Sequence, residues 1–403
     1  MEDWKILTHD RIQSLIEANL ENDPVRFALT HSNNEIPVSL VSNQLKSLQK
    51  ARTKLPLWYQ KRAILPPLAL EQCSSEATAS LKKHQGERAL DLSGGLGVDS
   101  YFLSQGFSHF VTLEVNPQLA EIQRYNLNLF QDDKIQVLNQ SAEDYLAQYQ
   151  GPPFDLIYVD PSRRGEHNQR INALTEGRPN ILQLLPLVMQ HARQLLIKAS
   201  PLLDLDEAYR LFPQASALKV VSLNNECKEV LILIENLAAD LPADAVETRL
   251  ELQMLRADRL QEYEFAYPFL ETGFAERASL PAFLAEPDVA FYKARALGQL
   301  WERSPKEQTK LTHPESYFFC EVPLPRDFPG RQFRVVEAMP YKPRQLKKWL
   351  KNQGTKRLNL SKRNFPESIQ QIRRQLQLAE GGEQFMLFSL WQGQRYAFFA
   401  ERI

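Results

Sequence analysis

The sequence predicts an α/β protein whose central part is a doubly wound, mainly parallel sheet. Residues 66–236 alternate short apolar runs, typical of strands, with stretches typical of helices. Two of the apolar runs end in a loop rich in glycine or proline, at the edge where doubly wound sheets bind their ligands. The last two runs, 217–223 and 229–235, flank the turn-like Asn224-Asn225-Glu226 and predict an antiparallel hairpin at the edge of the sheet.

Length and composition exclude several classes of protein. A chain of 403 residues, 43% hydrophobic and 24% charged, has material for two to four soluble domains. It contains no apolar run of the ~18 residues that cross a bilayer, and its start, Met1-Glu2-Asp3-Trp4-Lys5, does not resemble a signal peptide. We therefore expect a cytoplasmic protein without a membrane partner. Cys73, Cys227 and Cys320 are odd in number and far apart, so we expect buried thiols and neither disulfides nor a metal site.

The first 65 residues predict a helical region, because apolar residues recur at intervals of three and four. Within it, residues 46–62 hold six basic residues and no acidic one, with Trp58 and Tyr59 among them. Such a stretch can bind nucleic acid, since aromatic rings stack on bases and cations meet phosphates. It can equally be a solvated helix face with aromatic residues in the core.

The central region contains seven predicted strands, at residues 88–92, 109–114, 135–138, 155–159, 194–199, 217–223 and 229–235. Residues 237–330 are acidic and mixed, and they close on a proline-rich stretch, 322–330, that predicts a linker or domain edge. The final segment predicts a small α+β module. It has a strand at 333–337, helices at 344–352 and 368–378, and a hairpin of 384–390 with 395–399 around Gln392-Gly393.

Charge is divided unevenly along the chain. Residues 331–403 carry 15 lysines and arginines against 5 acidic residues, a net charge of +10, while the remainder carries −11. A basic module on an acidic body indicates a polyanionic partner such as RNA. The alternative is a small domain whose basic faces are merely solvated.

The glycine loop (residues 91–97, Asp91-Leu92-Ser93-Gly94-Gly95-Leu96-Gly97) follows the first predicted strand. Small residues let the backbone pass close to a ligand. Glu114 lies 17 residues beyond Gly97, at the end of the next predicted strand. A carboxylate at that place can accept both hydroxyls of a ribose. Alternatively, Glu114 caps the helix that begins after Pro117.

The proline loop (residues 160–164, Asp160-Pro161-Ser162-Arg163-Arg164) follows the fourth predicted strand. A carboxylate and a neighbouring carbonyl can accept the hydrogens of an amine and orient its lone pair. Arg163 can stack on a base or hold a phosphate. Alternatively, both arginines pair with carboxylates and serve only the conformation of the loop.

Together these segments resemble the class I S-adenosylmethionine-dependent methyltransferases. Their first motif has an acid followed by three alternating glycines, of which Ser93 replaces the first, and Glu114 matches their ribose-binding acid. The terminal hairpin also separates this sheet from that of NAD-dependent dehydrogenases. The resemblance implies S-adenosyl-L-methionine as cofactor and a Rossmann-like sheet. It implies cofactor contacts from Asp91, Ser93, Gly95, Gly97, Glu114, Ser141 and Ala142.

The proline loop is similar to the Asp/Asn/Ser-Pro-Pro-aromatic motif of amine-methylating members. Asp160-Pro161 matches the start of that motif and Ser162-Arg163-Arg164 departs from its end. The resemblance implies Asp160, Pro161 and Arg163 as catalytic residues. Upstream, Gln72 and Ser74 lie in a segment similar to one that covers the cofactor in nucleic-acid methyltransferases. Alternatively, Ser74 or Ser75 caps a helix that runs to Lys83.

The whole chain resembles one bacterial group, the class I methyltransferases with a C-terminal THUMP-like domain. Glu286-Pro287-Asp288 and Phe328-Pro329-Gly330 also match that group. It implies a helical region at 1–65, a methyltransferase domain at 66–236, a ferredoxin-like α+β region at 237–330 and a THUMP-like domain at 331–403.

The function implied is methylation of a base amine in tRNA or rRNA, with RNA bound by the basic domain. The alternatives are a methyltransferase for small molecules or proteins, and an RNA-binding protein without catalysis. The sequence carries no prediction of oligomeric state.

Overall fold

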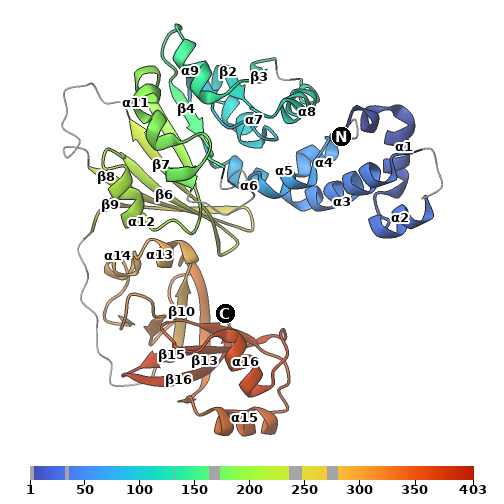
Figure 1. Ribbon diagram of the computed structural model, residues 1–403. Coiled ribbons are helices and arrows are strands. Elements are labelled where there is room, and N and C mark those ends of the chain that lie inside the picture. The colour runs from blue at the N-terminus through green and yellow to red at the C-terminus, as the bar shows by residue number, and fades with distance from the viewer. Residues whose placement is uncertain (1–3, 32–35, 132, 163–172, 236–246, 270–279) are drawn as a thin grey trace. The chain divides into compact units, whose positions relative to one another are not determined.

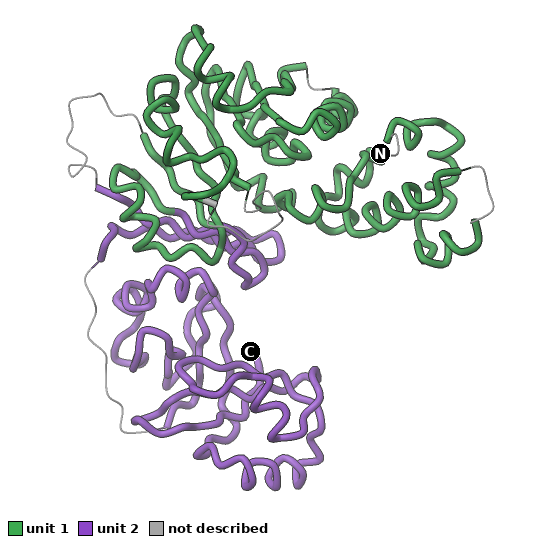
Figure 2. Tube along the Cα trace, in the orientation of Figure 1, with its two compact units in different colours: residues 1–218, 230–246 green, residues 219–229, 247–403 purple. Residues whose placement is uncertain are grey.

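The computed structural model describes residues 4–31, 36–131, 133–162, 173–235, 247–269 and 280–403. The chain forms two compact units (Figure 2): unit 1 contains Met1–Leu218 and Val230–Val246, and unit 2 contains Lys219–Glu229 and Glu247–Ile403. In the described residues, no helix is long and apolar enough to cross a membrane.

The sheet of unit 1 confirms the predicted strands, with three of them at the expected residues and four shifted at their ends. Strands β1 to β5 pair in parallel in the order β3-β2-β1-β4-β5, and β7 joins β5 antiparallel, followed by β6. This is the order expected of a class I methyltransferase sheet. The strands are β1 (Gly86–Asp91), β2 (Phe107–Leu113), β3 (Ile135–Leu138), β4 (Leu156–Val159), β5 (Gln194–Ala199), β6 (Ala217–Leu223) and β7 (Glu226–Glu235).

Helices connect the parallel strands, so the loops that follow the strands gather at one edge of the sheet (Figure 1). The helices are α7 (Val98–Ser104), α8 (Pro117–Asn128), α9 (Ala142–Gln148), α10 (Ala173–Glu176), α11 (Ile181–His191) and α12 (Leu205–Leu211). Strand β1 lies between β2 and β4, so the chain order reverses between β1 and β4. Both loops singled out in the sequence follow these two strands, at the switch point where such sheets bind ligands.

The N-terminal region is helical, as predicted. It comprises the 3₁₀ helix η1 (Trp4–Thr8) and helices α1 (Asp10–Asn19), α2 (Pro24–Thr30), α3 (Val38–Lys54), α4 (Pro56–Gln60), α5 (Pro67–Gln72) and α6 (Glu76–Ala79). Trp58 is fully buried, and its ring contacts Tyr101 and Phe130. Its burial makes it a core residue that no base can reach.

The cations around Tyr59 are already paired. The guanidinium groups of Arg52 and Arg62 lie over the Tyr59 ring, and they form ion pairs with Glu21 and Glu17. Two cations of the basic stretch at residues 46–62 are thus paired with acids and Trp58 lies in the core, which favours the second of the two alternatives.

The prediction that the hairpin of β6 and β7 ends the sheet is wrong. The hairpin of β6 and β7 is present, but it does not form the edge of the sheet, because β8 (Thr248–Arg256) follows β6 and pairs with β9 (Arg259–Tyr267). Lys219 Nζ lies 2.8 Å from Glu251 Oε2, which joins the faces of β6 and β8. The signal for both strands is present in the sequence, where apolar residues alternate with polar ones.

The second sheet of unit 2 has the order β11-β12-β10-β13-β16-β15-β14. Its strands are β10 (Phe283–Pro287), β11 (Thr309–Leu311), β12 (Phe318–Cys320), β13 (Gly330–Pro340), β14 (Asn359–Lys362), β15 (Gln384–Trp391) and β16 (Gln394–Arg402), with helices α13 (Val289–Lys293), α14 (Leu297–Glu302), α15 (Pro343–Asn352) and α16 (Ile369–Leu376). The predicted hairpin at Gln392-Gly393 joins β15 to β16. Leu284 of β10 pairs with Phe333 of β13, so residues on both sides of position 330 share one sheet. The division into four regions stays a prediction.

The two acids of the Glu286-Pro287-Asp288 motif bind other segments of unit 2. Glu286 is 1% exposed and accepts hydrogen bonds from Arg331 and from Arg363 Nε at 2.9 Å. Asp288 caps α13 and accepts a hydrogen bond from Ser222 Oγ at 2.5 Å. Both carboxylates therefore tie segments of unit 2 together.

Candidate active site at the carboxyl edge of the sheet

The glycine loop is open on one side and closely packed on the other. Gly97 adopts a left-handed conformation (φ +81°) and begins α7, and Gly95 is also left-handed (φ +55°). A Cβ on Gly95 would meet nothing nearer than Ser93 O at 3.8 Å, so this side can receive a ligand. A Cβ on Gly94 would lie 2.5 Å from Thr112 Oγ1. Gly94 thus serves packing, and Gly95 leaves room.

Asp91 is buried and has its partners within the chain. It is 1% exposed. Its Oδ1 accepts hydrogen bonds from Ser93 N at 2.8 Å and Ser93 Oγ at 3.0 Å, and its Oδ2 accepts one from Ser100 Oγ at 2.6 Å. Burial raises the pKa of Asp91 to about 7, although these hydrogen bonds oppose the shift. Asp91 therefore fixes the glycine loop and is shielded from a direct ligand contact.

Glu114 is half-buried and tied to the glycine loop. Gly95 N donates to its Oε2 at 2.9 Å, and Asn116 N donates to its Oε1 at 2.8 Å. Burial raises the pKa of Glu114, while these backbone hydrogen bonds act to lower it. Each oxygen keeps a lone pair that can accept a hydroxyl hydrogen. The side-chain cap of α8 is Asn116, which accepts a hydrogen bond from Leu119 N at 3.1 Å, so Glu114 is not that cap.

Asp160 contacts the glycine loop through its backbone and β5 through its side chain. Its N–H donates to Ser93 Oγ at 2.7 Å, and its Oδ2 lies 2.5 Å from Lys198 Nζ. Pro161 is buried, and Ser162 N donates to Arg178 O at 3.0 Å. Arg163, the third predicted catalytic residue, lies outside the described residues.

Asp99 connects four segments behind the two loops. Its Oδ2 accepts hydrogen bonds from Ser74 Oγ at 2.7 Å and Tyr158 OH at 2.9 Å, and its Oδ1 lies 3.0 Å from Lys82 Nζ. Lys198 Nζ is 3.7 Å from Oδ2. Burial on its own would raise the pKa of Asp99, but the charges of Lys82 and Lys198 outweigh it and hold this pKa well below its usual range.

The structure thus brings together eight of the predicted site residues through the contacts above or their position in the two loops: Ser74, Asp91, Ser93, Gly95, Gly97, Glu114, Asp160 and Pro161. The structure shows other contacts for the remaining predicted residues. Gln72 is exposed at the end of α5. Ser141 caps α9 by accepting a hydrogen bond from Asp144 N at 3.0 Å, and Ala142 is buried behind it. Ser75, not Ser74, caps α6, which ends at Ala79 rather than at Lys83.

Sequence reasoning missed four polar residues of this site: Lys82, Asp99, Tyr158 and Lys198. One signal was available, because Lys198 interrupts the apolar strand β5, and lysines are almost never fully buried unless they are paired. Asp99 was concealed because an acidic residue in the first turn of a helix is common.

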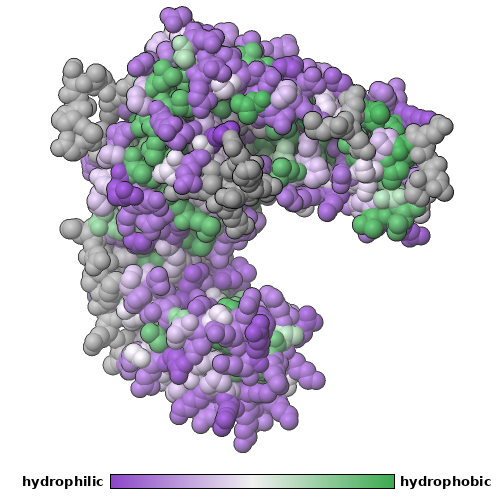
Figure 3. Space-filling model, viewed as in Figure 1, coloured by the Kyte–Doolittle hydropathy of each residue, from purple (hydrophilic) through white to green (hydrophobic). Residues whose placement is uncertain are grey.

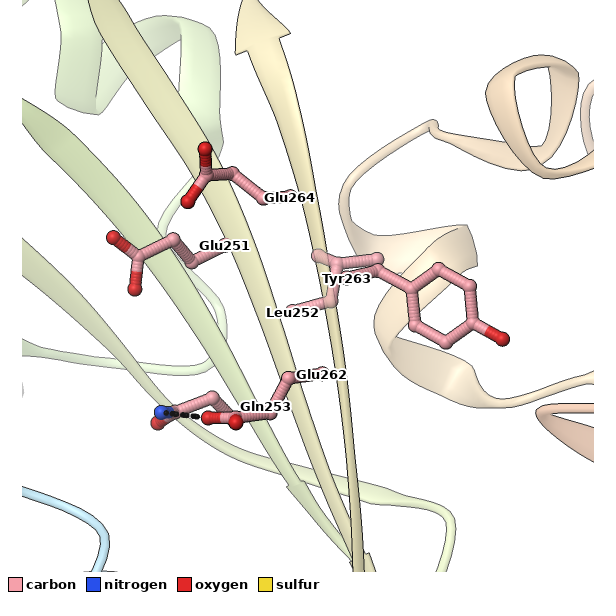
Figure 4. A pocket seen from close by; sticks show the side chains of 6 residues that line it. All are labelled: Glu251, Leu252, Gln253, Glu262, Tyr263 and Glu264. Atoms are coloured by element: carbon pink, nitrogen blue, oxygen red, sulfur yellow. Dashed lines mark hydrogen bonds between the residues drawn. The ribbon is translucent and has the colours of Figure 1, made fainter. Parts of the chain in front are cut away.

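Two surface depressions lie away from these residues. One, of about 580 Å³, is bordered by Gln13, Ser14, Glu17 and Ala18 of α1. The other, of about 220 Å³, runs along β8 and β9 and is lined by six side chains, three of them glutamates (Figure 4). There Glu262 accepts a hydrogen bond from Gln253 Nε2 at 2.9 Å, and Glu251 pairs with Lys219. Neither contains a residue that the sequence motifs single out.

Two protein families match parts of the chain: "THUMP domain-like" at residues 330–402 and "Conserved hypothetical protein 95" at residues 76–192. A crystal structure from Porphyromonas gingivalis W83, provisionally named a methyltransferase, covers 100% of this chain and 99% of its own length. It is 25% identical in sequence, with a TM-score of 0.82.

Curated relatives match shorter segments. The 23S rRNA (uracil(1939)-C(5))-methyltransferase RlmD of Vibrio parahaemolyticus is 23% identical over 221 residues, 54% of this chain and 50% of the relative. The ribosomal RNA small subunit methyltransferase J of Coxiella burnetii is 29% identical over 138 residues, 31% of this chain and 54% of the relative. The tRNA (uracil(54)-C(5))-methyltransferase of Pyrococcus horikoshii is 24% identical over 164 residues, 40% of this chain and 39% of the relative. The chain spans about half or less of the length of these relatives.

The strand order, the glycine loop and the family matches agree with one another. The chain shares its fold with the Porphyromonas gingivalis structure, and residues 330–402 match the THUMP-like family. The chain therefore combines a class I, S-adenosylmethionine-dependent methyltransferase domain with a C-terminal THUMP-like domain.

Proposed function

We propose that this protein transfers a methyl group from S-adenosylmethionine to an exocyclic amine of a base in tRNA or rRNA. The observation that carries the proposal is the position of Asp160. Its carboxylate follows β4 at the switch point, and its backbone N–H is bound to Ser93 of the glycine loop at 2.7 Å. An acid that can hold an amine thus lies beside the loop that would hold the cofactor.

The residues of the glycine loop fit this cofactor. When bound, S-adenosylmethionine supplies an electrophilic methyl group on a sulfonium. Gly95 leaves the backbone accessible, and Glu114 keeps lone pairs for the ribose hydroxyls. Asp91 acts through Ser93, because its own carboxylate is buried. The remaining predicted cofactor contacts are Gln72, Ser74, Gly97, Ser141 and Ala142.

Asp160 would orient the acceptor. Its Oδ2 is engaged by Lys198, whereas its Oδ1 has no hydrogen-bond partner among the described residues. An amine hydrogen donated to Oδ1 leaves the nitrogen lone pair free to attack the methyl carbon. The nitrogen–carbon bond forms as the carbon–sulfur bond breaks, with the electron pair passing to sulfur. The nitrogen then loses one proton, for which the Asp160 carboxylate is the adjacent acceptor.

An amine fits this chain better than the uracil carbon that two relatives methylate according to their names. Carbon 5 of uracil becomes nucleophilic only after a group such as a thiolate adds to the ring. The cysteine of unit 1 is Cys73, whose Sγ donates to Leu70 O at 3.3 Å. Burial raises the pKa of Cys73 to about 11, so the thiol stays protonated and weakly nucleophilic.

The basic face of α15 supports RNA as the partner. We define this face as Arg344, Lys347, Lys348 and Lys351, which are all exposed. None of the four is in an ion pair within the described residues. The surface of the THUMP-like domain is mainly hydrophilic in the view of Figure 3. Cations that are not neutralised by neighbouring acids are available to the phosphates of a nucleic acid.

The proposal is tested by incubating the protein with labelled S-adenosylmethionine and total RNA from cells that lack it. Label in one RNA species is the expected result. Cofactor binding without any labelled RNA would instead favour a small-molecule or protein acceptor. No cofactor binding would favour an RNA-binding protein without catalysis.

A further inference from the structure

We infer that Lys198, anchored by Asp99, is a positioning residue that fixes the Asp160 carboxylate for the acceptor amine. The inference rests on the proposed methyl transfer and adds two residues that the sequence motifs do not include. It also assigns a purpose to buried charges that the glycine and proline loops leave unexplained.

Lys198 approaches Asp160 from the protein interior. Its side chain is 8% exposed, that of Asp160 is 31% exposed, and the atoms Nζ and Oδ2 are 2.5 Å apart. The strand around Lys198 is apolar, with Ile197 fully buried. The lysine therefore binds one carboxylate oxygen from the inside and leaves the other accessible. Because Lys198 fixes Oδ2, the other carboxylate oxygen of Asp160 is held in one orientation towards an incoming amine.

Asp99 holds Lys198 in turn, from the first turn of α7. Helix α7 begins directly after Gly97, so Asp99 lies two residues beyond the end of the glycine loop. Its Oδ2 lies 3.7 Å from Lys198 Nζ, and its Oδ1 lies 3.0 Å from Lys82 Nζ. The path from the cofactor side to the acceptor side therefore runs through two adjacent ion pairs. The two lysines balance Asp99 and Asp160 in charge.

Stability alone is a weak reason to keep such a network. Removing charges from water costs about as much as their pairing returns, so buried ion pairs are often replaceable by apolar residues. Perturbed buried charges gather instead where a site needs a fixed geometry. Here the network ends at the single carboxylate that faces the acceptor. Displacing a catalytic group by about 1 Å can cost roughly a hundredfold in rate.

The test compares Lys198→Met, Lys198→Arg and Lys219→Met, all in the full chain. Methionine keeps the volume of the lysine stem and removes its charge. Lys219 is the control, because it is also a largely buried lysine of a strand that pairs with one carboxylate, that of Glu251, and it contacts no residue of the site. Single-turnover methyl transfer and the Kd for S-adenosylhomocysteine are measured at a temperature where each variant is folded by circular dichroism.

We expect Lys198→Met to lower the methyl-transfer rate by roughly 10- to 100-fold, with a Kd within about threefold of the wild type. Lys198→Arg should restore most of the rate, and Lys219→Met should stay within about threefold of the wild-type rate. Equal losses in Lys198→Met and Lys219→Met, or no rescue by arginine, would overturn the inference.

A second measurement does not depend on activity. Aspartate labelled with ¹³C at its side-chain carboxyl gives a resonance for Asp160, assigned by its loss in Asp160→Asn. This resonance should shift in Lys198→Met and stay in place in Lys219→Met. If the wild type transfers no methyl group to RNA, the proposed function fails, and the resonance still tells whether Lys198 positions Asp160. An unchanged resonance in Lys198→Met would overturn that contact.

Discussion

The hydroxyl of Ser93 accepts a hydrogen bond from the backbone N–H of Asp160 at 2.7 Å and donates one to Asp91 Oδ1 at 3.0 Å. A glycine stands at this position in the motif that the sequence resembles, and a glycine has no side chain to make either bond. The departure from the motif thus provides the link between the glycine loop and the proline loop.

Ser93→Ala removes this link while leaving the backbone in place. One hydrogen bond is worth about 1 kcal/mol, so we expect the methyl-transfer rate to fall about fivefold. Ser100→Ala is the control, because Ser100 also donates to Asp91 but not to the proline loop. Single-turnover rates check the prediction, and equal effects in both variants would contradict it.

The buried Asp91 carboxyl predicts a pH dependence of stability. Its pKa is about 7 in the folded protein against 3.8 for the ordinary group. Between these values the folded state holds a proton that the unfolded state releases, so stability falls as the pH rises from about 4 to 7, by about 4 kcal/mol in all. Asp91→Asn removes this titration. Calorimetry at pH 5 and pH 7.5 should therefore show a larger fall in Tm for the wild type. An equal or larger fall in the variant would be the contrary result.

Two neighbouring glycines should behave differently when replaced by alanine. In Gly94→Ala the new Cβ meets Thr112 Oγ1 at 2.5 Å, so we expect a lower Tm. In Gly95→Ala the Cβ enters open space at a left-handed residue, which costs about 1 kcal/mol of folding energy. There we expect mainly a cofactor Kd that is roughly tenfold weaker. Calorimetric titration with S-adenosylhomocysteine measures it, and an unchanged Kd in Gly95→Ala would show that the cofactor does not approach this side.

The basic face of α15 should govern RNA affinity. Replacing Arg344, Lys347, Lys348 and Lys351 by glutamine should weaken binding at least tenfold at moderate salt. It should also reduce the slope of log affinity against log salt by about 0.7 for each phosphate that is no longer neutralised. Lys46→Gln with Lys61→Gln, in the exposed part of the N-terminal basic stretch, is the control and should change affinity less than twofold. Filter binding with tRNA distinguishes the two surfaces, and the reverse ranking would move the RNA site to the N-terminal helices.

The sheet of unit 1 was predictable because its strands are apolar runs bounded by turn-forming residues, and β3, β5 and β6 occupy the predicted positions. Strands β8 and β9 were not predicted, although apolar residues alternate with polar ones along both, which is the pattern of a half-buried strand. The hairpin of β6 and β7 was therefore predicted to form the edge of the sheet, whereas β8 follows β6.

The loops of the site were predictable from glycine, proline and acid positions, whereas the contacts of their side chains were not. Ser75 and Ser141 act as helix caps, which a serine at a helix start favours in any context. Asp91 was expected to contact the cofactor. Its carboxyl group is instead buried and accepts hydrogen bonds from Ser93 and Ser100. Asp99 and Lys198 are 99 positions apart in the sequence, so only the fold reveals that they meet.

The proposed role of Asp160 is tested most directly by single-turnover methyl transfer to RNA with three proteins: the wild type, Asp160→Asn and Asp133→Asn. Asp133 is an exposed acid before β3, at the opposite edge of the sheet, and provides the same change of charge. We predict that Asp160→Asn loses at least a hundredfold in rate and binds S-adenosylhomocysteine as the wild type does, while Asp133→Asn keeps full activity. A wild-type rate in Asp160→Asn would contradict the assignment of Asp160 as the acceptor-binding acid.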